Sequence, residues 1–434
     1  MSSKRIEYKK GNIMNVRFSR TMKKVAAAVI AVATLGAVAA CGSSSAGDSA
    51  DDNTLTFSYW DTFPVLEEFK KANPDIKLKE VKVPGDSYNT KINQMILGNN
   101  APDVMLLQEA DYVRYAKNGV IEKLDDKLKD MGVDTNDMLP AVKGIADEVD
   151  GYYGLSQGMA TEIMYYNKDM FDAAGVAYPT SDWTWDDYAA AAQKLTKTEG
   201  GQTTQWGSDA PTFNGVWYSL AGQGGDAVVK DGKLSLGKGL KAALEYQNKM
   251  TNELKVQPTP SSGSKVSDLF AAGQAAMTLG GSWLISTTYK DADFNWDIAP
   301  MPAAPNGQDY NSLHTSFFSI SATSKHKTAA EKFIKWMMSD EGQIALEKAN
   351  ANISPFKSIG DKGDYQVQGK KGPSNWDAFT EAAEQGKFGY TTVASTPTFD
   401  LYNQINSYIL GQSSENDVLK TAVDKANKDI ADAQ

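Results

Sequence analysis

The chain of 434 residues is acidic, with 54 Asp and Glu against 44 Lys and Arg, and 41% of its residues are hydrophobic. The net charge of −10 disfavours nucleic acid as a partner, because binding nucleic acid depends on neutralising phosphates with basic side chains. With one cysteine and two histidines, the chain lacks both the even cysteine set of a disulfide framework and the clusters of a metal site. We therefore expect no cofactor and no bound metal.

The chain begins with a basic and then apolar leader. The basic residues are Arg17, Arg20, Lys23 and Lys24, and the apolar run 25–40 (VAAAVIAVATLGAVAA) follows them. The run is shorter than the roughly 20 residues that a membrane span needs, so residues 1–40 are interpreted as a secretory signal peptide. Met14 and Met22 are alternatives to Met1 as the start of translation.

The end of the leader, Val38-Ala39-Ala40-Cys41, resembles the lipobox of bacterial lipoproteins. In that class the cysteine thiol is acylated, the leader is cut before it, and the lipid holds the mature protein on the membrane. We expect Cys41 to be lipidated, and the protein to be anchored to the outer face of the bacterial cell membrane by this lipid alone. An ordinary signal peptide with a chance cysteine is the alternative.

The mature chain is more acidic than the whole. Residues 1–40 contain eight basic residues and one acid, so 36 basic and 53 acidic residues remain, for a net charge of −17. Residues 41–53 are small or acidic after the cysteine, a composition that predicts a flexible tether. The globular part from Leu55 has about 380 residues, more than one typical core holds, which predicts two lobes.

The first predicted elements alternate between strand and helix. The predicted strands are 55–60, 76–83 and 104–107, and the predicted helices are 65–69 and 88–97. The first helix ends near Pro74, which restricts the residue before it, and Gly98 ends the second. The continuous apolar run 104–107 is typical of a parallel strand buried on both faces. This alternation, with few hairpin signals, predicts an α/β fold with mostly parallel sheets.

Two later apolar runs, 163–167 and 317–320, are separated by about 150 residues. If each run crosses from one lobe to the other, the second lobe is inserted between them. The two crossing segments then form a hinge about which the lobes can close. Residues 331–338 form an amphipathic helix expected to pack on the first lobe, and Ser339 is expected to cap the next helix. Gly280 and Gly281 precede a predicted helix N-terminus, where their lack of side chains lets another group come close to the backbone. The segment either binds an anion there or is a plain strand-to-helix turn.

Four groups of segments carry a resemblance to a known family. They are LTFSYWD with FKKANPDIKL and APDVMLLQEADYVRYAKNGVIEKLDD; YYGLSQGMATEIMYYNKDMFDAAGV followed by DWTWDDYAAAAQKL; FAAGQAAMTLGGSWLI; and SFFSISATSKHKTAAEKFIKWMMSDEGQIAL. Together they resemble the extracellular solute-binding proteins of ABC transporters, the maltose-binding-like group, over essentially the whole mature chain. The resemblance implies a two-lobed periplasmic-binding-protein-like fold of type II, with a hinge and a ligand cleft between the lobes. We expect an N-terminal lobe of residues 54–160 plus 317–357 and a C-terminal lobe of residues 161–316 plus 358–434.

The aromatic residues indicate the ligand class. Sugars present apolar C–H faces and a rim of hydroxyls, so their sites combine stacked rings with amides and carboxylates. Aromatic and polar residues are expected here on loops at the carboxyl ends of strands. The expected substrate-binding residues are Tyr59, Trp60, Asp61, Gln108, Glu109, Asp111, Thr161, Phe213, Asn214, Trp217, Tyr218, Ser282, Trp283, Lys357 and Phe399. The resemblance places a ligand-stacking Trp at Trp283, whereas Leu107 stands where the maltose-binding member has an aromatic residue, which argues against maltose itself.

Other conspicuous residues are interpreted as structural. Trp183, Trp185 and Trp336 occupy positions expected to be helical and in the core, and His314 is expected to be a solvated turn residue near the hinge, with ligand contact as the alternative. Tyr165 and Tyr166 alternate as strand residues and do not form the tyrosine pair of a ferric-iron site. No motif of a nucleophilic, zinc-dependent or phosphate-binding enzyme occurs, so no catalytic residue is predicted.

The sequence thus predicts a monomeric, lipid-anchored protein that captures a carbohydrate, an oligosaccharide, by hinge closure and delivers it to the permease subunits of a membrane ABC importer. One alternative is the same fold with a non-sugar solute such as glycerol phosphate, a polyamine or a peptide. The others are a surface lectin or adhesin and an extracellular carbohydrate-active enzyme.

Overall fold

The computed structural model describes residues 53–211, 213–259, 268–305, 307–388 and 403–433. The leader 1–40, Cys41, nearly all of the tether 41–53 and Phe399 lie outside these residues. The strands are β1 (Thr54–Trp60), β2 (Lys77–Val83), β3 (Val104–Gln108), β4 (Leu155–Asn167), β5 (Lys197–Glu199), β6 (Gln202–Gln205), β7 (Val228–Lys230), β8 (Lys233–Ser235), β9 (Met277–Gly281), β10 (Trp296–Ala299), β11 (Asn311–Ile320) and β12 (Gly386–Lys387).

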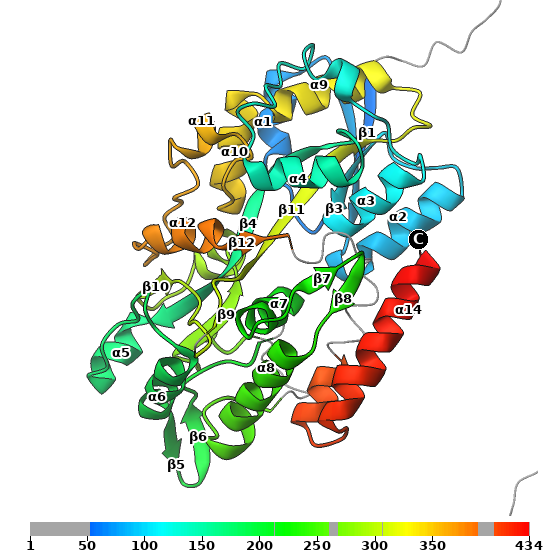
Figure 1. The fold of residues 1–434 in the computed structure, drawn as a ribbon. Coiled ribbons are helices and arrows are strands. Elements are labelled where there is room, and N and C mark those ends of the chain that lie inside the picture. The colour runs from blue at the N-terminus through cyan, green and yellow to red at the C-terminus, as the bar shows by residue number, and fades with distance from the viewer. Residues whose placement is uncertain (1–52, 212, 260–267, 306, 389–402, 434) are drawn as a thin grey trace, which may run out of the picture. The chain divides into compact units, whose positions relative to one another are not determined.

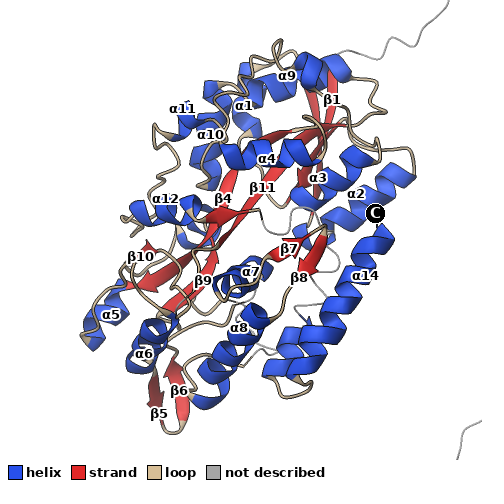
Figure 2. Ribbon diagram, in the orientation of Figure 1, coloured by secondary structure: helices blue, strands red, loops and turns tan. Residues whose placement is uncertain are grey.

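The helices surround these strands in Figures 1 and 2. They are α1 (Leu66–Ala72), α2 (Tyr88–Leu97), α3 (Glu109–Lys117), α4 (Pro140–Glu148), α5 (Lys168–Ala174), α6 (Trp185–Leu195), α7 (Asn214–Gln223), α8 (Lys238–Asn248), α9 (Lys327–Met337), α10 (Asp340–Asn350), α11 (Lys357–Gly360), α12 (Asp377–Glu384) and α14 (Val423–Ala433). Short π-helical segments lie at Lys249–Glu253, Ile285–Tyr289 and Asp417–Ala422. The predicted strands and helices up to residue 108 are confirmed, with bounds shifted by at most three residues.

One sheet joins the strands in the order β10-β4-β11-β3-β1-β2, and β9 and β12 pair with β4 and β11. Only part of it is parallel: β1 pairs parallel with β2 and β3, whereas β11 runs antiparallel to β3 and β4. The prediction of mostly parallel sheets was therefore wrong for the centre of the sheet. The reason is that the chain leaves one side along β4 and returns along β11, so these neighbours run in opposite directions.

Two short hairpins, β5–β6 and β7–β8, were also missed. Each has a two-residue turn, Gly200-Gly201 and Asp231-Gly232, in which both residues have positive φ. Turns of this kind match the twist of paired strands, and Asp-Gly is a common signal for them. The signals were present in the sequence, but the strands they join have only three or four residues each.

The core is divided between two lobes. Two apolar clusters draw on residues 55–155 and 317–359, and two others draw on residues 163–310 and 351–430. The long strand β4 contributes residues to clusters of both lobes, whereas β11 contributes Phe317, Phe318 and Ile320 to the clusters of the first lobe. As predicted, α9 packs on the first lobe, where the Phe333 ring lies 4.8 Å from the Phe57 ring, and Ser339 accepts a hydrogen bond from the Gly342 N–H at 3.2 Å. The proposed lobe boundaries within these strands stay a prediction.

A third segment runs beside the two crossing strands. Ile353 exchanges two backbone hydrogen bonds with Met159 of β4, at 2.7 and 2.9 Å. Gly158 has φ of 142° and lies so close to Asn352 that an added Cβ would be 3.0 Å from the Asn352 Cβ. The sequence predicted a hinge of two segments, and the structure adds residues 351–353, because α10 ends at Asn350 and its C-cap Ala351, in a left-handed conformation, directs the chain alongside β4.

The carboxyl group of Glu347 on α10 holds the start of this third segment. One oxygen accepts the Ser354 N–H at 2.8 Å, and the other has no hydrogen-bond partner among the described residues. The residue is 1% exposed, and burial raises the pKa of the carboxyl from 4.5 to about 7. The folded protein therefore keeps a proton on Glu347 over a pH range in which the unfolded chain has lost it.

We expect this group to make the free energy of unfolding fall as pH rises from about 4.5 to 7. The folded state binds more protons in that window, and a rise of this size corresponds to a loss of about 3 kcal/mol. Urea unfolding at pH 4.5 and pH 7.5 measures the loss in the wild type and in Glu347→Gln, in which it should be smaller by the contribution of Glu347. Glu341→Gln, an exposed site on the same helix, should retain the wild-type difference. Equal pH dependence in wild type and Glu347→Gln would contradict the assignment.

Candidate functional site

A buried carboxylate and a histidine face each other where β4 and β11 run side by side. His314 of β11 pairs with Ala160 of β4, so Glu162 lies diagonally opposite on the same face of the sheet. The Glu162 Oε1 is 2.7 Å from the His314 Nε2. Glu162 is 0% exposed and His314 is 8% exposed. His314 is therefore a buried strand residue, and the prediction of a solvated turn residue was wrong.

The first turn of α7 lies against this pair. A Cβ on Gly215 would be 2.2 Å from the Glu162 Oε1 and 2.7 Å from the His314 Nε2, so only glycine allows this approach. The N-terminus of a helix carries partial positive charge, which favours a carboxylate beside it. Gly215 thus places the positive end of α7 next to Glu162.

Two aromatic rings pack against His314. The Phe213 and Trp283 ring centroids are 5.0 Å apart at 79°, and each lies 5.4 Å from the His314 ring. Phe213 is 37% exposed and Trp283 is partly exposed. The Trp283 indole lies over Gly281, where an added Cβ would be 2.0 Å from the ring. The absence of a side chain at Gly281 therefore makes room for this ring, whereas a Cβ on Gly280 would meet Leu284.

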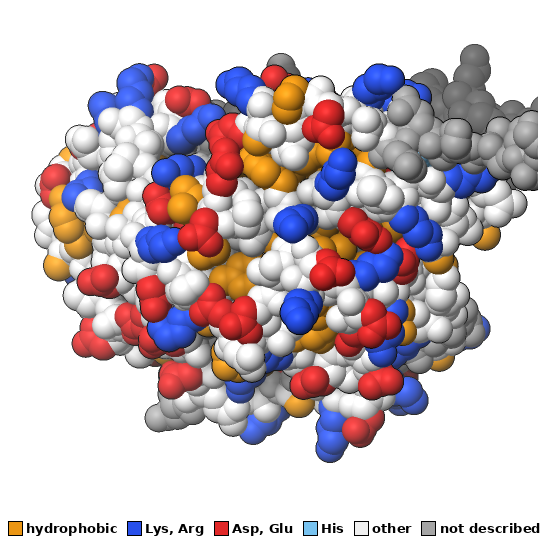
Figure 3. Space-filling model, turned by 90° about the horizontal axis from the view of Figure 1, so that it is seen from above, with side chains coloured by type: hydrophobic (Ala, Val, Ile, Leu, Met, Phe, Trp, Pro, Cys, Tyr) orange, Lys and Arg blue, Asp and Glu red, His pale blue; other side chains and the backbone are white. Residues whose placement is uncertain are grey.

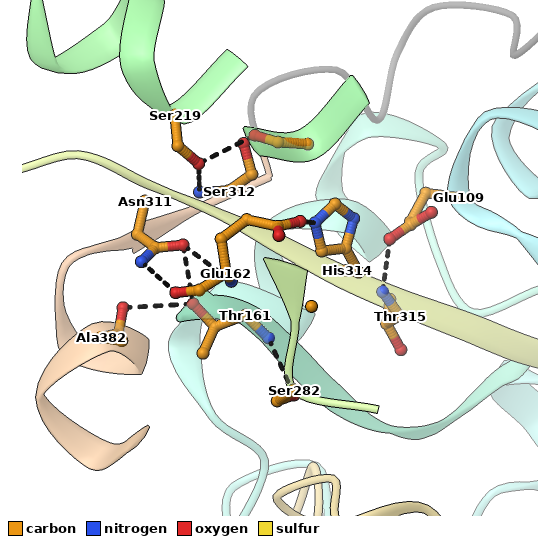
Figure 4. A network of polar contacts seen from close by, with 12 residues as sticks. Glu109, Thr161, Glu162, Ser219, Ser282, Asn311, Ser312, His314, Thr315 and Ala382 are labelled. Carbon is orange, nitrogen blue, oxygen red and sulfur yellow. Dashed lines mark hydrogen bonds and ion pairs between the residues drawn. The ribbon is translucent and has the colours of Figure 1, made fainter. Parts of the chain in front are cut away.

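Backbone and side-chain hydrogen bonds fix the two strands around Glu162 (Figure 4). Asn311 accepts from the Thr161 hydroxyl at 2.8 Å and from the Glu162 N–H at 3.0 Å, and donates to the Glu162 carbonyl at 2.7 Å. The Ser282 hydroxyl accepts the Thr161 N–H at 3.3 Å. This network of buried groups holds Glu162 and the Trp283 turn in one arrangement.

The first lobe contributes a second buried carboxylate, Glu109, at the start of α3. It accepts the Thr315 N–H, one residue beyond His314, so it approaches the pair from the other lobe (Figure 4). Burial raises the pKa of the Glu109 carboxyl, while the nearby His314 and the Thr315 N–H oppose that rise. Two acids and one base therefore lie together at the crossing of the strands.

Three more predicted residues lie at the carboxyl ends of β1 and β3, which are neighbours in the sheet. Trp60 packs edge-to-face on Tyr88 with centroids 5.2 Å apart and is partly exposed. Asp61 and Gln108 are exposed, Asp61 accepts the Gly85 N–H at 3.1 Å, and Gln108 accepts from Asn89 at 3.4 Å. The structure thus brings Trp60, Asp61, Gln108 and Glu109 to one edge.

Three other predicted residues are core residues. Tyr59 packs on Phe57 and Phe63, because neighbouring strand residues point to opposite faces and Trp60 takes the outer one. Trp217 and Tyr218 were expected on a loop, but they lie within α7 and are buried in the second lobe. Their expected placement facing the cleft was wrong, because α7 continues into the core after its exposed first residues.

The remaining predicted residues lie in different surroundings, some buried and some in ion pairs. Thr161 and Ser282 are buried in the hydrogen-bond network, and Asn214 is the first residue of α7. The Asp111 carboxylate is paired with Arg114. Lys357 is exposed, its ammonium pairs with Asp361 at 2.7 Å, and its N–H bonds to Asp137. Of the core tryptophans, Trp185 and Trp336 lie buried in helices as predicted, whereas Trp183 is partly buried just before α6.

Sequence reasoning missed Glu162 as a site residue. The signal for it was an acidic residue inside an otherwise apolar strand, since a buried charge requires a partner. The partner could not be identified from spacing, because 152 residues separate Glu162 and His314 along the chain.

We expect Gly215→Ala to destabilise the protein by about 1–3 kcal/mol, the usual cost of overpacking a filled core. The new methyl group would overlap both Glu162 and His314. The matched control is Gly144→Ala in α4, which meets nothing within 4 Å and should raise stability by up to about 1 kcal/mol through helix propensity. Urea unfolding measures both, and a Gly215→Ala variant as stable as wild type would contradict the close approach of α7.

Other surface features do not involve these residues. One hollow of about 480 Å³ is lined by Pro64, Val65, Glu68, Ser286, Lys290, Ala345, Lys348, Ala349, Val367, Gln368 and Gly369. A second of about 420 Å³ lies around residues 168–172, 295–296 and 368–374. Neither contains a predicted site residue, and neither combines exposed rings with buried carboxylates. Acidic and basic side chains are interspersed on the face drawn in Figure 3.

Two kinds of feature are absent from the described part of the chain. Within it, no group of three or more His, Cys, Asp or Glu side chains is placed to hold a metal ion. Among its helices, none has both the length and the apolar character needed to cross a membrane.

Comparison with known proteins identifies the family. A maltooligosaccharide ABC transporter solute-binding lipoprotein of Streptococcus pneumoniae is 27% identical over 355 residues, which cover 76% of this chain and 80% of the relative. An arabinooligosaccharide-binding protein of Bacillus subtilis is 27% identical over 352 residues, covering 75% and 79%. An ABC substrate-binding protein from Listeria monocytogenes, solved in complex with cycloalternan, has a TM-score of 0.77 at 26% identity and covers 87% of this chain and 99% of its own. This likeness confirms the predicted two-lobed α/β fold. Residues 57–344, more than half of the chain, match the family profile, and the chain therefore belongs to the bacterial extracellular solute-binding proteins.

Proposed function

We propose that this protein captures an oligosaccharide between its lobes and delivers it to the permease subunits of a membrane ABC importer. The observation that carries the proposal is the pair of partly exposed rings, Phe213 and Trp283, packed on His314, which contacts the buried Glu162. Rings of this kind stack on the apolar faces of sugars, and carboxylates accept hydrogen bonds from hydroxyl groups. The names of the Streptococcus and Bacillus relatives give further support.

Capture uses both lobes. Trp60, Asp61, Gln108 and Glu109 act from the first, and Phe213, Asn214 and Trp283 act from the second. A ligand that touches both lobes binds the closed state more tightly than the open one, so it shifts the population toward closure. A micromolar dissociation constant corresponds to about −8.2 kcal/mol, which a few stacked rings and hydrogen bonds can supply. The closed form is then the one that the permease recognises.

Isothermal calorimetry against a panel of neutral oligosaccharides tests the proposal, with glycerol 3-phosphate, spermidine and a tripeptide as controls. We expect binding of at least one oligosaccharide, without turnover, and no binding of the controls. A charged non-sugar as the sole ligand would overturn the carbohydrate assignment, and hydrolysis of the bound sugar would favour an enzyme.

We further propose that lipid on Cys41 is the protein's only membrane attachment and that it acts as a monomer at the outer face of the cell membrane. Cys41→Ser in the full chain should leave the protein unprocessed or released, because the thiol that accepts the lipid is gone. Membrane fractionation and mass spectrometry measure this, and the stability of residues 54–434 should not change. A Cys41→Ser protein that still carries lipid and stays with the membrane refutes the assignment.

A further inference from the structure

We propose that the site selects carbohydrates without negative charge, either neutral or amine-bearing, and that Glu162, Glu109 and His314 cause it to reject anionic sugars such as uronates and sugar phosphates. The inference rests on the proposed function, since it specifies the class of sugar bound at the same site.

The charge of the three groups is the first argument. Glu162 and Glu109 are acids and His314 is the base between them, linked by the contact of 2.7 Å and by the bond from the Thr315 N–H. Together the three groups can carry two negative charges but only one positive charge. All three are nearly buried, so water screens their charge less than it would at the surface.

The free oxygen of Glu162 is the second argument. Its Oε2 is buried and has no hydrogen-bond partner among the described residues, although its Oε1 is taken by His314. A buried acceptor of this kind favours donors, such as hydroxyl or ammonium groups, and repels a carboxylate or phosphate. Glu162 contacts His314, on which the rings of Phe213 and Trp283 pack edge-to-face, so a ligand stacked on those rings lies close to the carboxylate.

The lack of a guanidinium group is the third argument. Arg114 is the one arginine in residues 41–434. It is paired with Asp111, donates to Asn93 at 3.2 Å and lies 4.7 Å from the centroid of the Tyr115 ring. Arginine is the side chain suited to bidentate binding of carboxylate and phosphate, and here it is already engaged. Lys387, on the strand beside Asn311 and Ser312, is directed at the Tyr310 ring, 5.4 Å away.

The size of the effect follows from Coulomb's law. Two like charges about 6 Å apart at an effective dielectric constant near 20 repel enough to weaken binding about tenfold to hundredfold. We therefore expect an anionic sugar to bind at least tenfold more weakly than its neutral counterpart.

The experiment compares matched ligands by calorimetry with the purified protein. The probes are maltotriose, cellotriose, galactotriose and mannotriose, each with the triuronate obtained by oxidising its C6 positions. The readout is the dissociation constant of the triuronate divided by that of its neutral sugar. A purely structural defect would weaken both ligands alike and leave this ratio unchanged. Glu162→Gln should lower the ratio about tenfold by removing one negative charge.

The matched control is Glu347→Gln, which removes a carboxyl of similar burial, also with one free oxygen, from α10. It should leave the ratio unchanged. Glu109→Gln on the first lobe should also lower the ratio, and it provides an independent variant if Glu162→Gln does not fold. A triuronate that binds as tightly as its neutral sugar overturns the inference while the carbohydrate proposal stands. If no sugar of either kind binds in this or the wider panel, the proposed function fails and the inference with it.

Discussion

Trp283→Ala is expected to lose about 2–4 kcal/mol of oligosaccharide binding, the range for truncating an aromatic hot spot. The indole is partly exposed, lies over Gly281 and packs edge-to-face on Phe213 and His314, so one of its faces is left for a sugar ring. The melting temperature without ligand should change little, because most of the apolar core lies elsewhere. Calorimetry and thermal unfolding of the same variant separate the two effects.

Trp283→Tyr is the matched control for this result. It retains an aromatic face over Gly281 and should keep part of the affinity. If Trp283→Ala unfolds the protein, the residue is structural; if it binds the sugar normally, the stacking role is wrong.

Trp336→Ala is expected to show the opposite pattern, with a loss of about 3–5 kcal/mol in the free energy of unfolding. Trp336 lies in α9, is 8% exposed and packs edge-to-face on Phe69 of α1 with ring centroids 5.5 Å apart. Its removal leaves a cavity between two helices of the first lobe. Sugar affinity at a temperature where the variant is folded should stay near that of wild type, because the residue does not contact the site.

Trp336→Phe should cost less, because it retains a ring against Phe69. The Trp336 indole N–H has no hydrogen-bond partner among the described residues, so replacing the indole with a phenyl ring breaks no hydrogen bond with them. Urea unfolding of the two variants measures the difference, and a Trp336→Ala protein of wild-type stability would show that this ring is not part of the core.

The candidate site shows which residues a sequence can identify. Trp60, Gln108 and Glu109 were predicted to lie where strands end, and the structure places them there, because a strand's carboxyl end is a local feature. Tyr59 lies in the core of the first lobe, a placement that the same local pattern could not show, because it does not tell which face of β1 is covered by α1 and α9. Trp217 and Tyr218 were misplaced for a similar reason, because the burial of α7 depends on β11 and α8 packing around it.

The sequence by itself determined the elements whose cause is local. The helix at 88–97, the strand at 104–107 and the cap at Ser339 all follow from side-chain periodicity, Gly98 and a serine ahead of two acids. It also determined the family resemblance, the leader with its Cys41 motif, and the two apolar crossings. Only the tertiary structure decided the antiparallel pairing of β4 with β11, the third segment at 351–353 and the contact between Glu162 and His314. These features join residues about 150 or more positions apart, so their geometry depends on how the lobes pack and on the missing side chain of Gly215, neither of which any local pattern encodes.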